Sequence, residues 1–503
     1  MNARRNLVLS AAAVVLAGCA ALEPADLEAE FTPPPADSAL WDAMEQAGPE
    51  DWLFLLNDGP TALEWRLRAI DSATESIDLQ TFLWHFDTSG SLLLDHLVRA
   101  ADRGVQVKVL VDDTFLLGED DVLEALHEHH NIEYRVFNPY RRRASGFVTR
   151  QVLNLAEYDR LDHRMHNKSM IVDDRVAIVG GRNLGDEYFG LDPEANFRDM
   201  ELMAGGSLVP RLAATFDKYW NDHWSIPIEQ LTDAEPSEEA LARARTAMAN
   251  DVYQHVEEDE AARQAEWLAM LRNTVQGTVR ILADEPPVQN PADRASAPVQ
   301  VANELIREFD AAEDEILIIS AYLIPTVELE AAVERAAARG VRVRILTNSI
   351  RSNNHLTAHS AYRNHIDELL QNGAELHEVR VDAEDRHRYM LTPVERKSLA
   401  LHAKALVIDD AKVFIGSANL DPRSLRINTE MGLLVESPEL NARVRTAVGG
   451  DFDARNAWRL ERSADGHVYW VSNELRLDRQ PAASFMQRIE DWFFAHLPIE
   501  NEM

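Results

Sequence analysis

Two short motifs in this sequence pair a histidine with a lysine two residues later: His166 with Lys168, and His402 with Lys404. Apolar residues follow each pair, so each motif is predicted to enter a β-strand, where side chains two apart point to the same side. Lysine is rare here, with six lysines among the 50 basic residues, so its presence at both places is informative. A compact ammonium group with rotatable donors suits a phosphate oxygen. The two pairs therefore indicate phosphate chemistry.

The residues that follow each pair strengthen this interpretation. An apolar strand, an Asp-Asp turn and a second strand ending in Gly-Gly or Gly-Ser predict a β-hairpin, and glycine there lets backbone N–H groups approach a phosphate. A single His-x-Lys is also what an ordinary strand histidine would give, but here the whole pattern recurs at fixed spacing. Asp173 and Asp409, at the turns, are interpreted as structural members of the candidate catalytic set. The equivalent residues are His166, Lys168, Asp173, Gly180, Gly181 and Asn183 in the first motif, and His402, Lys404, Asp409, Gly416, Ser417 and Asn419 in the second.

The motifs belong to a larger internal repeat. Segments 166–183 and 402–419 lie 236 residues apart, and so do 100–113 and 336–349. Each half reads as strand, helix, buried strand, helix, strand and hairpin, which predicts an α/β fold: two pseudo-symmetric repeats, each a mixed β-sheet flanked by helices. The predicted organisation is a first repeat over 48–228, a helical insert over 229–277, and a second repeat over 278–503 that ends in an amphipathic helix.

This twinned pattern resembles the signature of the phospholipase D superfamily, in which H-x-K-x4-D is followed by G-G/S-x-N. Several flanking stretches resemble bacterial cardiolipin synthases, most closely the third bacterial type: LQTFLWHFDTSGSLLLDHLVRAADRGVQVKVLVDD, LNLAEYDRLDHRMHNKSMIVDD, NLDPRSLRINTEMGLLV and LPIE. The resemblance covers nearly the whole chain after its first residues. It implies that the two repeats pack with pseudo-two-fold symmetry and share one active site at their junction.

The resemblance also implies the roles of the motif residues. In such a site one imidazole attacks a phosphodiester to form a phosphohistidine, and the other protonates the leaving alcohol and later deprotonates the acceptor. By analogy with related enzymes, His166 is the expected nucleophile and His402 the expected acid and base. No metal ion or other cofactor is required. The residues expected to hold the phosphate oxygens are Lys168, Lys404, Asn183, Asn419, Gly181 and Ser417.

A nucleophilic histidine also needs an acceptor on its other ring nitrogen, so that the attacking nitrogen is unprotonated and aimed. Comparison with the family suggests Asp199 and Glu430 for this role. They lie 33 residues beyond His166 and 28 residues beyond His402, each at the start of a further predicted strand. The alternative is that both are ordinary solvent-facing acids on a strand.

Composition limits the class of protein. A chain of 503 residues with 46% hydrophobic and 27% charged residues is typical of a globular protein with two domain-sized units. The formal net charge of −35 disfavours nucleic-acid binding and indicates a solvated acidic surface. Because Cys19 is the only cysteine, an internal disulfide is excluded.

The first residues predict a bacterial lipoprotein signal. Residues 1–18 combine a basic start with an apolar stretch too short to span a membrane, and the segment 16–19, LAGC, resembles the box in which the cysteine is acylated. A plain secretory leader with an incidental Cys19 is the alternative. Residues 19–47, which include three consecutive prolines, are interpreted as a tether. The expected location is the bacterial cell envelope, anchored to a membrane and facing the periplasm or the exterior.

Three further groups of residues receive structural interpretations. The arginines 141–143 are expected in an exposed loop rather than on an anionic headgroup. The HEHH run at 127–130 is expected at a helix end, because it lacks the carboxylate or cysteine partners of a metal site. The apolar residues of 484–499 have helix-face spacing and predict a helix that packs on the core, with membrane contact as the alternative.

These observations lead to one expected function and three alternatives. The expected function is phosphatidyl transfer at a membrane surface, forming cardiolipin from phosphatidylglycerol and a second phospholipid. A phospholipase D that hands the same intermediate to water is an alternative that the motifs cannot separate. A nuclease is disfavoured by the acidic charge, and a non-catalytic lipid-binding scaffold is disfavoured by two intact motifs.

Overall fold

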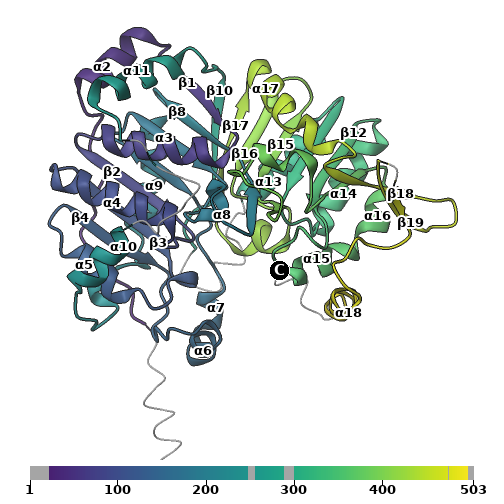
Figure 1. The fold of residues 1–503 in the computed structure, drawn as a ribbon, viewed down its shortest axis with the longest axis horizontal. Helices are drawn as coiled ribbons and strands as arrows, with labels where there is room; N and C mark the ends of the chain where they lie inside the picture. Colours follow the sequence, from purple (N-terminus) through teal and green to yellow (C-terminus); the bar gives the residue numbers. More distant parts are fainter. Residues whose placement is uncertain (1–21, 247–254, 256, 288–299, 474, 497–503) are drawn as a thin grey trace, which may run out of the picture.

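The structure is a computed structural model that describes residues 22–246, 255, 257–287, 300–473 and 475–496. The predicted signal peptide 1–18, the predicted acylation site Cys19 and the LPIE segment lie outside the described residues. Within those ranges, no helix is long and apolar enough to cross a membrane. The described chain forms two α/β halves that lie side by side (Figure 1).

The first half is built on one mixed sheet. Its strands are β1 (Trp52–Leu56), β2 (Ser76–Thr81), β3 (Gln106–Asp112), β4 (Ile132–Phe137), β5 (Ser169–Val172), β6 (Val176–Gly180), β8 (Glu201–Gly205) and β9 (Ser225–Pro227). They are arranged in the order β1-β8-β6-β5-β2-β3-β4-β9. Strands β2, β3 and β4 run parallel, and all other neighbours are antiparallel.

Helices cover both faces of this first sheet. Helix α9 (Val209–Trp220) packs on the face toward the other half, and the opposite face carries α3 (Gly59–Ser72), α4 (Thr88–Asp102), α5 (Asp120–His127) and α10 (Glu238–Arg245). The described part of the predicted insert supplies α10 and α11 (Glu260–Leu271). The α11 residue Trp267 is buried against Trp41, with ring centres 5.6 Å apart.

The second half repeats this sheet and extends it. The order β10-β17-β16-β15-β11-β12-β13 matches the first sheet strand for strand up to β4, and β18-β19-β20 continue it beyond that point. The sequence analysis did not anticipate this three-stranded extension. The strands are β10 (Thr278–Ala283), β11 (Glu315–Ser320), β12 (Arg342–Asn348), β13 (Glu375–Val379), β15 (Lys404–Ile408), β16 (Lys412–Gly416), β17 (Met431–Glu436), β18 (Ala457–Arg462), β19 (Val468–Ser472) and β20 (Leu475–Leu477).

Equivalent local signals build equivalent elements in the two halves. Helices α4 and α14 (Val327–Ala338) start at Asp87 and Thr326, whose side chains accept a hydrogen bond from a backbone N–H of the first turn. Both helices are followed by glycine, Gly104 and Gly340, at φ values of 100° and 91° that favour this residue. The predicted α/β fold of two repeats, each a mixed sheet flanked by helices, is confirmed. The remaining helices of the second half are α13 (Gln300–Ala311), α15 (Leu356–Arg363), α16 (Ile366–Gln371), α17 (Pro438–Gly449) and α18 (Phe485–Phe494).

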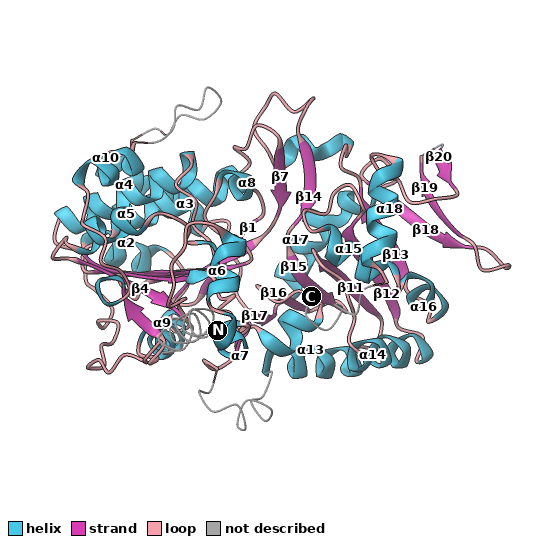
Figure 2. Cartoon of the chain, turned by 90° about the horizontal axis from the view of Figure 1, so that it is seen from below, coloured by secondary structure: helices cyan, strands magenta, loops and turns pink. Residues whose placement is uncertain are grey.

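The two halves share a hydrophobic core at their junction. Val179 and Leu202 of the first sheet belong to the same buried cluster as Ile415 and Leu433 of the second. A separate two-stranded parallel ribbon, β7 (Ala195–Arg198) with β14 (Ser398–Leu401), also crosses between the halves, as Figure 2 shows. The junction is therefore held both by apolar burial and by backbone pairing.

The prediction of a tether over 19–47 is wrong for its described part, residues 22–47. Ala36 donates its backbone N–H to the carbonyl of Asp173, and the Thr32 hydroxyl donates to Asp78. Residues 39–47 form helix α2 (Ala39–Ala47), which buries Trp41. A proline-containing segment need not be free, because protein side chains satisfy its backbone groups as well as water does.

The prediction that the C-terminal helix packs its apolar face on the core is also wrong. In α18 the side chains of Phe485, Trp492 and Phe493 are 71%, 54% and 54% exposed, whereas Asp491 is buried. The periodicity showed an apolar face but could not show which way it points. The prediction that residues 141–143 lie in an exposed loop is wrong for Arg143. Its side chain is buried in ion pairs with Asp113 and Asp120.

Candidate active site

The first motif histidine contacts a carboxylate of the other repeat. The Nδ1 atom of His166 lies 3.0 and 2.9 Å from the two carboxyl oxygens of Glu430. Glu430 is completely buried, and His166 is 8% exposed. This geometry orients the ring so that its other nitrogen, Nε2, is left for chemistry.

The second motif histidine makes the reciprocal contact. The Nδ1 atom of His402 lies 2.6 Å from Oδ2 of Asp199. Both residues are buried. The two carboxylates suggested by the family resemblance therefore contact histidines, but each contacts the histidine of the other repeat rather than the one that precedes it in the sequence.

Backbone pairing explains this exchange. Met165 forms a parallel bridge with Thr429. This bridge brings together the residues that follow them, His166 and Glu430. In the same way Leu401 pairs with Arg198 in the β7–β14 ribbon, which brings their successors, His402 and Asp199, together. The site exists only when both repeats are folded against each other.

Burial sets the protonation of the first pair. Burial lowers the pKa of His166 well below its usual range, and the positive charges of Lys168 and Lys404 lower it further. Burial raises the pKa of Glu430 to about 8, although Lys168 opposes this shift. At neutral pH this is a neutral imidazole beside a largely protonated carboxyl group.

The second pair has a different charge. Burial alone would raise the pKa of Asp199, but His402, Lys404 and Arg182 hold it below its usual range. Arg182 also donates to the backbone carbonyl of Asp199 at 2.6 Å. Burial and the charge of Lys404 lower the pKa of His402 to about 3, although Asp199 opposes this shift, so His402 is neutral in the unliganded site. Asp199 stays ionised beside it, and its negative charge stabilises an imidazolium when a bound phosphate anion offsets the charge of the lysines.

The two motif lysines are buried within the same site. Lys168 donates to the backbone carbonyl of His166 at 2.7 Å, and Lys404 makes the equivalent bond to His402. Burial lowers the pKa of Lys168 well below its usual range and that of Lys404 to about 8. An anion bound between them would favour the charged form of both lysines.

The small residues of the motifs contact the carboxylates. A Cβ atom on Gly181 would lie 2.8 Å from Oδ1 of Asp199, so only glycine fits. The hydroxyl of Ser417 lies 2.5 Å from Oε2 of Glu430.

Asn183 donates to the hydroxyl of Tyr188 at 2.9 Å. Among the described residues, the Oδ1 atoms of Asn183 and Asn419 are buried without a hydrogen-bond partner.

The motif aspartates lie at the hairpin turns and contact backbone there. Asp173 accepts hydrogen bonds from the backbone of residues 74–76 and from the indole of Trp41. Asp409 accepts from the equivalent amides of residues 313–315. Both have a positive φ, 53° and 50°. Each carboxylate fastens its hairpin to the start of the neighbouring strand, β2 or β11.

A cavity of about 690 Å³ opens beside His166. Its exposed wall is mostly apolar, with Phe82, Phe115 and Tyr322 among its residues, and polar and charged side chains line the rest. Asn419 also lines it, and residues of both repeats contribute. A cavity of this size and composition holds a ligand with an apolar portion next to the histidine.

The sequence analysis missed several residues around the site. Two arginines, Arg164 and Arg423, line the cavity, and the Nη2 atom of Arg164 is buried without a partner in the described part of the chain. Aromatic rings flank the histidines: Phe82 lies 5.0 Å from His166 and Tyr188 lies 5.0 Å from His402, measured between ring centres. All four lie in or near the stretches that carry the family resemblance, but no spacing rule singled them out.

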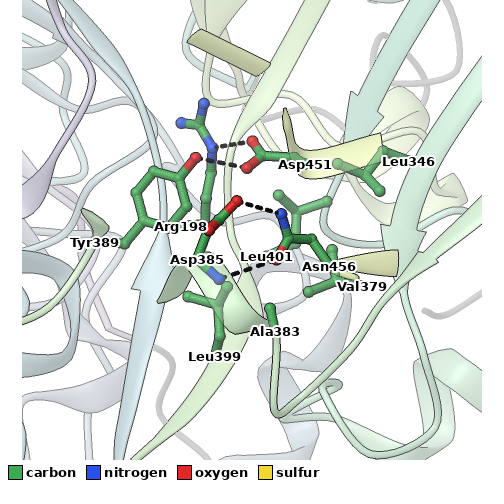
Figure 3. A pocket seen from close by; sticks show the side chains of 10 residues that line it. All are labelled: Arg198, Leu346, Val379, Ala383, Asp385, Tyr389, Leu399, Leu401, Asp451 and Asn456. Atoms are coloured by element: carbon green, nitrogen blue, oxygen red, sulfur yellow. Dashed lines mark hydrogen bonds and ion pairs between the residues drawn. The ribbon is translucent and has the colours of Figure 1, made fainter. Parts of the chain in front are cut away.

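A buried polar network supports the second pair from outside. Arg198, directly before Asp199, reaches across the junction and lies 2.9 Å from the Asp451 carboxylate (Figure 3). Tyr389 donates to the same carboxylate at 2.5 Å. Asp385 and Asn456 are joined by two further hydrogen bonds in this pocket. The network fixes the backbone that positions Asp199.

Known proteins match this chain over most of its length. Residues 67–220 and 305–450 match the family described as cardiolipin synthase, PLD-like domain. Cardiolipin synthase C of Escherichia coli (strain K12) is 35% identical over 463 residues, covering 89% of this chain and 95% of that protein. Cardiolipin synthase A of Pseudomonas putida (strain GB-1) is 27% identical, covering 82% of this chain and 71% of that protein.

A solved structure has the same fold. The crystal structure of phosphatidylserine synthase from Haemophilus influenzae Rd KW20 aligns with a TM-score of 0.57 at 16% identity, covering 85% of this chain and 93% of that one. Together with the family match, which covers both repeats and both motifs, this confirms the resemblance inferred from the sequence. The chain belongs to the cardiolipin synthase family of phospholipase D-like proteins.

Proposed function

We propose that this protein transfers a phosphatidyl group between phospholipids, forming cardiolipin from phosphatidylglycerol and a second phospholipid. The observation that carries the proposal is the joint site: two histidines from different repeats, each held by a buried carboxylate, beside a large apolar cavity. Cardiolipin synthases among the relatives support the same substrate class. The cavity suits a substrate with acyl chains, and the cardiolipin synthases among the relatives favour a lipid acceptor over water.

In the first chemical step, the unprotonated Nε2 of His166 attacks the phosphorus of phosphatidylglycerol. A nitrogen–phosphorus bond forms as the bond from phosphorus to the glycerol headgroup breaks, and a protonated His402 gives its proton to the leaving oxygen. Ionised Asp199 supports the imidazolium that this step requires. Lys168 and Lys404 neutralise the phosphate oxygens as charge builds up.

In the second step, a phosphatidylglycerol molecule takes the place of the departed glycerol as the acceptor, because only its headgroup offers the glycerol hydroxyl that cardiolipin formation requires. Neutral His402 removes the proton from the acceptor hydroxyl, whose oxygen attacks phosphorus while the bond to His166 breaks. The cycle ends with His166 neutral and His402 protonated, as in the substrate-bound site in which the first step begins. His402 takes up this proton when the phosphate anion binds, because the anion and Asp199 together favour the imidazolium. Water in place of the acceptor would give phosphatidic acid instead.

The test is product analysis with the purified full chain. Mixed vesicles of phosphatidylglycerol and phosphatidylethanolamine are expected to yield cardiolipin. Phosphatidic acid as the sole lipid product would show a hydrolase. DNA is supplied separately, and its cleavage without any lipid turnover would show a nuclease. No turnover of any substrate, with lipid bound, would indicate a scaffold.

We further propose that the protein is a lipoprotein of the bacterial cell envelope, anchored through Cys19. The support is the sequence of residues 1–19. Cys19→Ser is expected to leave the protein unprocessed or to release it from the membrane, as judged by fractionation and N-terminal mass analysis. Unchanged detergent-requiring association with a correctly processed N-terminus would contradict this proposal.

A further inference from the structure

Helix α18 presents its polar side to the protein and its apolar side to solvent. The buried Asp491 lies 2.9 Å from Nδ1 of His359 and 3.1 Å from the guanidinium of Arg363, both on α15. On the outer side, Phe485, Met486, Ile489, Trp492 and Phe493 are 41–71% exposed; these five residues are called the α18 patch. A helix that is held by a buried ion pair and faces outward with its aromatic rings is suited to an apolar surrounding.

A second exposed apolar patch lies in the first repeat. Helix α6 (Phe147–Leu153), the turn η2 (Leu155–Glu157) and helix α7 (Tyr158–Leu161) connect β4 to the first motif. The second patch, called the α6–α7 patch, consists of Phe147, Val148, Val152, Leu153, Leu155 and Tyr158. The described part of the chain exposes fifteen large hydrophobic side chains, and eleven of them belong to the α6–α7 patch or the α18 patch.

One patch borders the cavity beside His166, and the other is attached to a helix that lines it. Phe147, Leu155 and Tyr158 line the cavity as well as the surface. The α18 patch is fastened to α15, whose Thr357 and Ala358 line the cavity from the second repeat. Figure 1 shows α6, α7 and α18 along the same lower side of the molecule, from both halves. The α6–α7 patch is therefore continuous with the cavity, and α15 links the α18 patch to the cavity wall on the other side.

The N-terminal segment leads to the same region. The described chain begins at Leu22, whose backbone N–H donates to the carboxylate of Glu157 in η2 at 3.3 Å. Cys19 precedes it by three residues, a length of chain that spans at most ~11 Å. An acyl chain attached to Cys19 would therefore enter a bilayer close to the α6–α7 patch.

We propose that the α6–α7 patch and the α18 patch insert together into the surface of a phospholipid bilayer, with the cavity opening onto the lipid between them. The inference rests on the proposed function for the identity of the lipid. A bilayer contacts two separate patches from different repeats at once and surrounds the cavity mouth with substrate. Trp492 and Tyr158 are residue types that favour the boundary between water and acyl chains. The contacting side chains are apolar, so they can oppose the repulsion between the acidic chain and an anionic bilayer, which salt screens.

The test places a fluorescent label on the full chain and measures contact with acyl chains. Trp492→Cys and Val152→Cys introduce one labelling site in each patch, and Ala265→Cys places a matched site on the exposed side of α11, at the opposite end of the molecule. Unsubstituted protein gives the background from Cys19. The proteins are reconstituted into phosphatidylethanolamine and phosphatidylglycerol vesicles whose acyl chains carry a quencher. Labels at 492 and 152 are expected to lose most of their emission, at least as fully at high salt as at low salt because salt screens the repulsion from the anionic lipid, and the label at 265 to keep it.

Two outcomes would overturn the proposal. Labels at both patch positions that keep their emission on quencher vesicles would show that the patches stay in water. Labels that become shielded without vesicles as protein concentration rises would show an interface between two copies of the chain. Because the readout does not use turnover, absence of cardiolipin synthesis would refute the proposed function without affecting this result.

Discussion

The two histidine–carboxylate pairs occupy equivalent places in the repeats but have unlike surroundings. His402 and Asp199 lie at the end of a ribbon with four paired positions, and Arg198 beside them is locked to Asp451. At His166 a single backbone bridge holds the pair, and the ring borders the cavity. Only Asp199 keeps its charge at neutral pH, because burial raises the pKa of the other carboxyl to about 8.

This difference shows how a duplicated motif can divide a reaction into two roles. A neutral histidine beside an uncharged carboxyl and an open cavity is suited to attack phosphorus. A histidine beside a fixed negative charge is suited to carry a proton. We therefore expect the same two residue types to perform different chemistry because burial and neighbouring charges differ, and each of the following experiments tests that difference.

The largest effect is expected from removing either histidine. His166→Ala and His402→Ala should each reduce turnover about 10⁴-fold or more, and the double variant should be little worse than either single one. The reason is that each half supplies one of the two groups of a single site. Cardiolipin formation per folded molecule is the measurement. Half of the activity left in either variant would show two independent sites.

The two roles can be separated with an activated substrate whose leaving group needs no proton. His402→Ala should still accept the phosphatidyl group on His166, and the adduct should persist because no base activates the acceptor. His166→Ala should carry no adduct. Intact-mass analysis after a brief incubation detects the added mass. An adduct on His166→Ala alone would reverse the assignment of the two roles.

A smaller but unequal effect is expected at the carboxylates. Asp199→Asn should lower kcat/KM about 10³-fold, because it removes the charge that supports protonated His402. Glu430→Gln should lower kcat/KM about tenfold or less below about pH 7, since Glu430 is largely protonated there and the amide resembles that form.

The pH profile sharpens this comparison of the carboxylates. Only the unsubstituted protein can lose a proton from Glu430. The ratio of its kcat/KM to that of Glu430→Gln should therefore stay constant below about pH 7 and change as pH rises through the pKa of about 8. Steady-state rates from pH 6 to pH 9.5, in roughly half-unit steps, would measure it. Equal losses for the two variants at pH 7 would contradict the charge difference between the pairs.

The smallest effects are expected at the turn aspartates, on stability rather than on chemistry. Asp173→Ala should destabilise the protein by about 3 kcal/mol, because it leaves buried backbone donors and the Trp41 indole without an acceptor. Asp409→Ala should cost about 1 kcal/mol, because water reaches the amides of residues 313–315. Thermal unfolding measures both. A loss of activity in fully folded Asp173→Ala protein would assign it a catalytic role.

Much of the fold could be read from the sequence because it depends on local periodicity. The strand and helix pattern, the glycines at 104 and 340 and the fixed spacing of the motifs are properties of neighbouring residues. The extension β18–β20 was missed, because it lies outside the repeated pattern. The described residues before 48 were misread, because proline content alone does not show whether a segment lies on a surface that can satisfy its backbone.

For the site, the sequence predicted which residues meet: a repeated His-x-Lys with its glycine, serine and asparagine companions, and the two carboxylates suggested by family comparison. Only the tertiary structure decided how they combine. Each histidine meets the carboxylate of the other repeat because two parallel pairings cross the junction. Protonation depends on burial, and the outward direction of the α18 patch depends on which side of the helix finds a polar partner, here His359 for Asp491. Residue spacing predicts neither the protonation of the site nor the direction of the α18 patch, because both arise from contacts between segments distant in the chain.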